Sequence, residues 1–261
     1  MTIDPRSLLS RYGLRAKSYY SQNFLVSGQV IQKMASYAKG TVLEVGPGLG
    51  TLTEELAKNA ENVIAIEKDP NMVRVLTQEH DWDNVEIIYA DVLEMEVPRF
   101  DVCISSVPYS ISSPLLFKLL GLEYEYLVLM LQKEFAEKLY SSENPSRLTM
   151  MSQALCDTTP VMKVPPKAFF PRPKVNSMIV RIVPNRKFTV DEAYSTVVTS
   201  LMTHKKKIVR NALIDSRESF NKDKEEMRVV AEDVPYRNVR GKDLDIYKMK
   251  EITDYIINAI G

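Results

Sequence analysis

The stretch Thr41-Val42-Leu43-Glu44-Val45-Gly46-Pro47-Gly48-Leu49-Gly50 decides the fold. Its first half is mostly apolar and β-branched, which is typical of a buried strand. Its second half holds three of the nine glycines of a 261-residue chain, although a simple turn needs only one. Glycine lets the backbone approach a ligand closely, and the first turn of a following helix offers free N–H groups. The spacing GxGxG differs from the standard NAD-binding fingerprint. The stretch therefore predicts a ligand-binding crevice of another kind after the first strong strand.

Strand-like and helix-like segments alternate around this stretch. We expect strands at 62–67, 85–91, 100–105 and 124–131, and helices at 28–39, 51–59, 70–79 and from about 132. Short apolar strands separated by helices predict a mostly parallel α/β sheet. Two later strands, at 159–164 and 175–183, are joined by a proline-rich loop that leaves no room for a helix. We therefore expect an antiparallel hairpin at the edge of the sheet.

The pattern changes near Pro184, where the strands stop. Beyond it we expect only helices, at 190–203, 205–216, 221–231 and 243–259. This predicts two domains, an α/β domain of residues 1–184 and a small all-α domain of residues 185–261. Residues 1–27 are basic and are expected to be irregular.

The charge of the chain is unevenly distributed, although its formal total is zero from 34 basic and 34 acidic residues. Residues 1–40 carry a net charge of +5 and residues 41–130 a net charge of −11. Residues 131–184 and 185–261 carry +4 and +2. The total alone would argue against a nucleic-acid partner, but this asymmetry keeps one open.

Cysteine and histidine are scarce, with only Cys103, Cys156, His80 and His204. Their spacing is not typical of a zinc site or of a disulfide framework. The N-terminus is polar, and no apolar run reaches the roughly 18 residues of a membrane span. We therefore expect a cytoplasmic protein with no metal and no membrane association.

Two carboxylates stand where the next strands end. Glu67 ends the second strand, 17 residues after Gly50, and Asp91 ends the third. A carboxylate in the first position can accept hydrogen bonds from both hydroxyls of a ribose. One in the second position can accept a hydrogen bond from an adenine amino group. Because parallel strands end at the same edge of a sheet, the glycines and both acids together predict a nucleoside-binding crevice.

The tetrapeptide Ser106-Val107-Pro108-Tyr109 follows the fourth strand. It resembles the (Asn/Asp/Ser)-x-Pro-(Tyr/Phe) signature of S-adenosylmethionine-dependent methyltransferases that modify exocyclic amines. The wider sequence resembles one family more closely, the small-subunit ribosomal RNA adenine N6,N6-dimethyltransferases, which are related to the erythromycin-resistance methyltransferases. The matching stretches are, in chain order, 21–25 (SQNFL), 44–50 (EVGPGLG), 111–114 (ISSP), 169–177 (FFPRPKVNS) and 204–213 (HKKKIVRNAL).

The resemblance implies a class I methyltransferase fold with a Rossmann-like sheet. Residues 1–184 would bind S-adenosylmethionine and catalyse the reaction, and residues 185–261 would be a helical RNA-binding domain. Methyl groups would pass to N6 of two adjacent adenosines near the 3′ end of small-subunit ribosomal RNA. The substrate would be the immature small ribosomal subunit during ribosome biogenesis. We expect a monomer, since nothing in the sequence demands a dimer.

The resemblance also assigns a cofactor site. Its N-terminal members, Gln22, Asn23 and Leu25, would close over the cofactor. The full set is Gln22, Asn23, Leu25, Glu44, Gly46, Gly48, Gly50, Glu67, Lys68, Asp91, Val92 and Ser106.

Methyl transfer to adenine explains the residue types of the tetrapeptide. The N6 lone pair is delocalised into the ring, so the reaction needs acceptors that localise and aim it. The Pro108 carbonyl is suitable because proline fixes its orientation. Ser106 stands where the family usually has Asn, and its hydroxyl can also accept but is shorter and rotates freely. Tyr109 and Phe169 are expected to stack on an extruded base.

Residues 158–214 carry 11 basic and 2 acidic residues, which predicts contacts with RNA phosphates. The expected RNA-binding residues are Arg172, Lys174, Lys205, Lys206, Lys207 and Arg210.

Two alternatives remain at this point. The enzyme could act on adenine in large-subunit RNA or in DNA, because the motifs barely separate these substrates. Alternatively, a non-catalytic ribosome-assembly or nucleic-acid-binding factor could have kept the fold, and Ser106 is the feature that keeps this alternative open.

Overall fold

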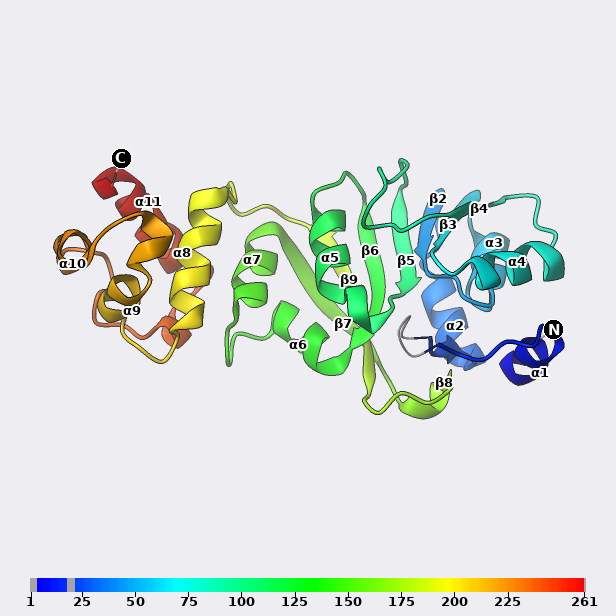
Figure 1. The fold of residues 1–261 in the computed structure, drawn as a ribbon. Coiled ribbons are helices and arrows are strands. Elements are labelled where there is room, and N and C mark those ends of the chain that lie inside the picture. The colour runs from blue at the N-terminus through cyan, green and yellow to red at the C-terminus, as the bar shows by residue number, and fades with distance from the viewer. Residues whose placement is uncertain (1–3, 18–21, 261) are drawn as a thin grey trace. The chain divides into compact units, whose positions relative to one another are not determined.

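The computed structural model describes residues 4–17 and 22–260. The chain forms two compact units. The first comprises Met1–Ala136 and Thr158–Pro184, and the second comprises Glu137–Asp157 and Asn185–Gly261. Figure 1 shows the helices and strands of both units.

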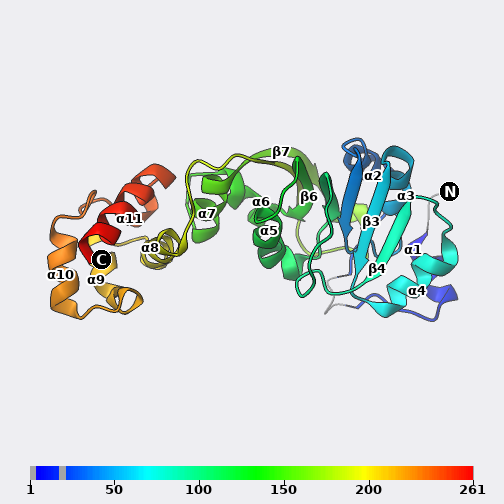
Figure 2. The ribbon, with the colours of Figure 1, turned by 90° about the horizontal axis from the view of Figure 1, so that it is seen from above.

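The first unit is built on a seven-stranded sheet, as far as the described residues show, with the order β4-β3-β2-β5-β6-β9-β7. Its strands are β2 (Thr41–Val45), β3 (Asn62–Glu67), β4 (Val85–Tyr89), β5 (Val102–Ser106), β6 (Tyr126–Gln132), β7 (Cys156–Val164) and β9 (Ser177–Pro184). In sheet order, β4, β3, β2, β5 and β6 each pair in parallel with the next strand. Strand β9 runs antiparallel to β6. Figure 2 shows β2, β3 and β4 side by side at one end of this sheet. The predicted mostly parallel α/β sheet with antiparallel strands at its edge is confirmed.

Helices α2 (Gly28–Ala35), α3 (Thr53–Asn59) and α4 (Pro70–Glu79) confirm the three predicted in this region. Helix α2 packs its apolar side, with Met34 and Ile31, into a cluster that also holds Val42 and Ile104 of the sheet. Helices α5 (Ser112–Leu120) and α6 (Lys133–Tyr140) follow β5 and β6. The apolar spacing of each helix therefore determines which face it presents to the strands.

Helix α1 (Pro5–Arg11) lies where we expected irregular chain. Asp4 caps it by accepting hydrogen bonds from the amides of Arg6 and Ser7, and Leu8 and Leu9 are buried. The prediction was wrong because a seven-residue helix is too short to show a clear apolar period.

A second, two-stranded sheet pairs segments that are far apart in the sequence. Strand β1 (Phe24–Leu25) runs antiparallel to β8 (Phe169–Phe170), with Leu25 opposite Phe169. Strands of two residues carry no periodic signal, so the sequence did not predict this pairing.

The second unit is helical. It contains α7 (Arg147–Leu155), α8 (Glu192–Thr203), α9 (Val209–Asp215), α10 (Lys224–Glu232) and α11 (Ile246–Ile260). The last four match the predicted C-terminal helices to within a few residues. Residues 137–157, expected in the first domain, instead cluster with these helices. The reason is visible in the contacts: the fully buried Tyr194 donates a hydrogen bond to the Met150 carbonyl, and the Lys205 ammonium donates to Asn144.

The described residues contain neither a membrane-spanning helix nor a cluster of metal-ligating side chains. No helix there is long and apolar enough to cross a membrane. No group of three or more His, Cys, Asp or Glu side chains there is placed to hold a metal ion.

The loop after β2 depends on glycine at Gly50. Its φ of +81° lies in the left-handed region that disfavours other residues. A Cβ at this position would lie 2.9 Å from His80 Nε2, 2.9 Å from Leu76 Cδ2 and 3.0 Å from the Trp82 ring. Both the backbone and the surroundings therefore require glycine here.

Gly50→Ala should lower the free energy of unfolding by roughly 1–3 kcal/mol, because alanine is strained at this φ and crowds three side chains. The measurement is urea unfolding. Gly28→Ala is the matched control, since a Cβ at Gly28 meets nothing within 4 Å. Equal stability of the two variants would contradict this account of the loop.

Candidate active site

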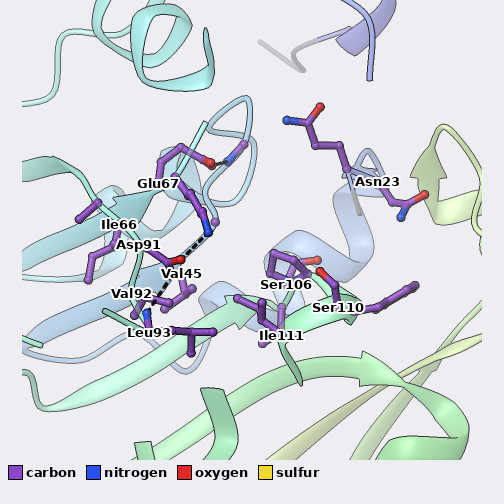
Figure 3. Close-up of a pocket in the computed structure, with 18 of the residues that line it drawn as sticks. Asn23, Val45, Ile66, Glu67, Asp91, Val92, Leu93, Ser106, Ser110 and Ile111 are labelled. Atoms are coloured by element: carbon purple, nitrogen blue, oxygen red, sulfur yellow. Dashed lines mark hydrogen bonds and ion pairs between the residues drawn. The ribbon is translucent and has the colours of Figure 1, made fainter. Parts of the chain in front are cut away.

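A cavity of about 430 Å³ opens where β2, β3 and β5 end. Figure 3 shows Glu67 and Asp91 on one side of it and Ser106, Ser110 and Ile111 on the other. It brings together nine of the twelve predicted cofactor residues: Gln22, Asn23, Gly46, Gly48, Glu67, Lys68, Asp91, Val92 and Ser106. Ser21, the first residue of the matching N-terminal stretch, lies outside the described residues.

Glu67 holds the glycine loop through its carboxylate. Oε2 accepts from the Gly48 amide at 3.2 Å, and Oε1 accepts from the Asp69 amide at 2.8 Å. Burial raises the pKa of Glu67, and these backbone donors partly oppose that shift. The side chain is 8 % exposed and lines the cavity, so it can still accept hydrogen bonds from a ligand.

Asp91 is held in its ionised form on the same side of the cavity. The Lys68 ammonium bonds its Oδ2, and the Leu93 amide donates to Oδ1 at 3.0 Å. The hydrogen bond from Lys68, followed by the one from Leu93, lowers the pKa of Asp91. A carboxylate has about four acceptor positions, so capacity remains for a ligand.

The glycines leave room that a side chain would fill. A Cβ at Gly46 would lie 3.2 Å from the Pro108 ring, and one at Gly48 would lie 3.1 Å from the Phe24 ring. Both have positive φ. The space above the loop therefore depends on the residue type that the sequence singled out.

Gln22 joins the wall through a fixed side chain. Its Oε1 accepts from the Lys17 amide, and its Nε2 donates to Asp69 Oδ2, each at 2.8 Å. The Asp69 carboxylate is fully buried and also accepts from the Lys17 ammonium at 3.0 Å. The N-terminal segment is therefore anchored at the start of α4.

The tetrapeptide borders the cavity at the end of β5. Ser106 is the last residue of the strand, and Pro108 and Tyr109 follow it in the wall. The Pro108 carbonyl accepts from the Ile111 amide at 3.0 Å and keeps a second lone pair. The Tyr109 hydroxyl shares a 2.6 Å hydrogen bond with the Ser177 hydroxyl, which is buried at the start of β9. Burial raises the pKa of Tyr109, so its phenol stays neutral.

Three predicted cofactor residues do not line the cavity. Glu44 is 2 % exposed and accepts from the Thr53 hydroxyl at 2.6 Å. Leu25 is buried and pairs with Phe169, and Gly50 packs against the residues before β4. These three residues support the site without contacting the cavity, because Glu44 and Leu25 are buried in the core and Gly50 packs against core side chains.

Phe169 also lies away from the cavity. It is 3 % exposed and packs in one buried cluster with Leu25, Val164 and Ile179. This differs from the stacking role expected for it. Phe169 pairs with Leu25 in the small sheet and its ring lies in the core, and two-residue strands carry no sequence pattern that predicts this pairing.

A second cavity of about 460 Å³ shares Gln22, Asn23 and Tyr109 with the first. Its other lining residues are Ala16, Gln132, Pro171, Pro173, Lys174 and Val175. Tyr109 therefore belongs to the walls of both cavities. We had not singled out Gln132, although its place at the carboxyl end of a predicted strand was a usable signal.

The comparison with known proteins decides the family. The family model described as ribosomal RNA adenine dimethylase matches residues 13–250. The chain belongs to this family. The probable ribosomal RNA small subunit methyltransferase A of Thermococcus sibiricus is 40 % identical over 266 residues, which cover 97 % of this chain and 96 % of that protein.

Two solved structures support the same conclusion for this ribosomal RNA adenine dimethylase. A dimethyladenosine transferase from Plasmodium falciparum is 30 % identical with a TM-score of 0.73, over 88 % of this chain and 95 % of that chain. The 23S rRNA methyltransferase ErmE is 26 % identical with a TM-score of 0.65, over 90 % and 100 %. The expected fold and the expected relation to the erythromycin-resistance enzymes are confirmed.

The predicted RNA-binding residues of this dimethylase differ in availability. Arg172 and Lys174, in the first unit, are exposed and have no hydrogen-bond or ion-pair partner among the described residues. The same holds for Lys206 in the second unit. In contrast, Lys205 donates to Asn144 and to the Pro145 carbonyl. Lys207 pairs with Asp215, and Arg210 pairs with Glu232.

Glu44 predicts a pH dependence of folding for the dimethylase. Burial raises its pKa from 4.5 to about 8. Between these values the folded chain binds more protons than the unfolded chain, so stability falls as pH rises through this window. Glu44→Gln removes this dependence, so its urea midpoint should gain on the wild type between about pH 5 and about pH 8. Glu61→Gln, at an exposed site, is the control. A gain for Glu44→Gln that is the same at every pH would contradict the assignment.

Proposed function

We propose that this protein transfers methyl groups from S-adenosylmethionine to N6 of two adjacent adenosines near the 3′ end of small-subunit ribosomal RNA. It acts as a monomer in the cytoplasm, on the immature small ribosomal subunit. One observation carries the proposal: Tyr109 of the tetrapeptide lines both the cavity with the two carboxylates and the second cavity, which Lys174 also lines. A cofactor and a base can thus be bound on either side of one residue.

The residues of the first cavity fit S-adenosylmethionine. Glu67 would accept from ribose hydroxyls, Asp91 would accept from the adenine amino group, and the space above Gly46 and Gly48 would admit the ligand. When bound, S-adenosylmethionine supplies a methyl group on a positively charged sulfur.

The tetrapeptide would position the acceptor amine. The Pro108 carbonyl and the Ser106 hydroxyl would accept the N6 hydrogens, which localises the lone pair and aims it. Neither group is a strong base, so their contribution is orientation. The Tyr109 ring, held at its hydroxyl by Ser177, would stack on the extruded base. The side chain of Ser106 is shorter than that of asparagine. This difference would affect how readily the enzyme adds a second methyl group.

Phosphate contacts would come first from Arg172, Lys174 and Lys206, which are exposed and have no partner among the residues that the structure describes. Lys207 and Arg210 would contribute by exchanging their surface ion pairs for phosphates, which costs little because exposed pairs are weak. The Lys205 ammonium already donates to Asn144 and to the Pro145 carbonyl before α7, so its main role would be to hold that segment.

A labelled-methyl assay tests the proposal. Small subunits isolated from a strain that lacks this gene should accept label from S-adenosylmethionine, and digestion with mass spectrometry should find dimethyladenosine in the small-subunit RNA. Large subunits and DNA serve as controls. Label in large-subunit RNA or DNA with none in small subunits would reject the proposed substrate.

Tyr109→Ala should lower kcat/KM for small subunits roughly 5- to 150-fold, the range that corresponds to one lost stacking contact. Tyr109→Phe is the matched variant, because it keeps the ring and loses only the bond to Ser177. It should retain more activity than Tyr109→Ala. Wild-type activity in Tyr109→Ala would refute the role of the ring.

A further inference from the structure

We propose that Gln132 recognises the base, by pairing its side-chain amide with the edge of the adenine that enters the second cavity. This inference rests on the proposed function, since it specifies how the same site selects its substrate. Gln132 is half-buried, is the last residue of β6 and lines the second cavity.

The strand register places Gln132 next to the anchor of Tyr109. Gln132 lies directly opposite Ser177 in the antiparallel pair of β6 and β9. Residues that oppose each other in such a pair have their side chains on the same face of the sheet, with Cβ atoms about 4.5–5.5 Å apart. Ser177 holds the Tyr109 hydroxyl at 2.6 Å. The Gln132 amide is therefore on the side of the sheet where the aromatic ring stands.

The polar groups of the second cavity differ in what they can still bind. The Gln22 amide is engaged by Lys17 and Asp69, and the Tyr109 hydroxyl by Ser177. Asn23 also has a partner within the chain. The Gln132 amide has no hydrogen-bond partner in the described part of the chain. It and the Lys174 ammonium have free hydrogen-bonding capacity in this wall.

The free amide can donate a hydrogen bond to a ring nitrogen of adenine. The Pro108 carbonyl and the Ser106 hydroxyl would accept the two N6 hydrogens, so the Gln132 amide would donate to N7, the ring-nitrogen acceptor beside N6. In 7-deazaadenine a C–H group replaces N7, so this hydrogen bond is lost while the N6 amine is kept. Pro171, Pro173 and Val175 supply an apolar wall, where an unmatched polar group is costly. The lysine ammonium also donates, so a Gln132 variant is needed to tell the two donors apart.

The test compares two RNA hairpins in the presence of S-adenosylhomocysteine. One carries the two adjacent adenosines, and the other carries 7-deazaadenosine at both positions. Wild-type protein should bind the adenosine hairpin roughly 5- to 150-fold more tightly, by fluorescence anisotropy. Gln132→Leu should lose this preference, with an unchanged Kd for S-adenosylhomocysteine and an unchanged urea midpoint. Gln78→Leu, at an exposed position on α4, is the matched control and should behave as wild type.

Three results would overturn the inference. They are a wild type without preference, a Gln132→Leu variant that keeps it, and a variant that loses affinity for S-adenosylhomocysteine or loses stability. The last would show that Gln132 supports the structure instead of the base. Failure of the proposed function looks different, because wild-type protein would then leave small subunits unmethylated whatever the hairpins show.

Discussion

The Glu67 carboxylate is the constraint on which the site depends. It accepts one hydrogen bond from the Gly48 amide in the loop after β2 and one from the Asp69 amide at the start of α4. The Asp69 side chain in turn accepts from Lys17 and Gln22 of the N-terminal segment. Two neighbouring acids therefore connect three segments that are far apart in the sequence. Hydrogen bonds in which a carboxylate accepts from backbone or side-chain donors are among the stronger ones in proteins.

Much of the fold could be predicted because its signals are local. The strands after residue 41 are short and apolar, and the helices between them have a clear period, so the parallel sheet follows from the pattern. Pairings that depend on contacts between distant segments left no such signal. The two residues of β1 pair with β8, which lies more than 140 residues further along the chain. Residues 137–157 belong to the helical unit, where the buried Tyr194 bonds the Met150 carbonyl.

The site shows the same limit at single residues. Glu44 and Glu67 both lie on neighbouring strands near the glycines, and the sequence could not tell which one faces the cavity. Burial and the Thr53 hydroxyl turn Glu44 into a core residue, whereas Glu67 lines the wall. The acidic excess of residues 41–130 is likewise not all free charge at the cavity: burial raises the pKa of Glu44 to about 8, and Asp91 is paired with Lys68. Phe169 is turned inward by its strand partner, and Gln132 was overlooked because one glutamine forms no motif.

The small sheet of β1 and β8 has a thermodynamic consequence. Gln22 and Asn23, which immediately precede β1, line both cavities, and Pro171, which immediately follows β8, lines the second. The two strands form one hydrogen-bonded ribbon, so a displacement of either strand is transmitted to the other. Any such coupling between the ligands of the two cavities is reciprocal: the free energy with which the first favours the second equals that with which the second favours the first. A ribbon of four residues thus joins segments that line the walls of both cavities.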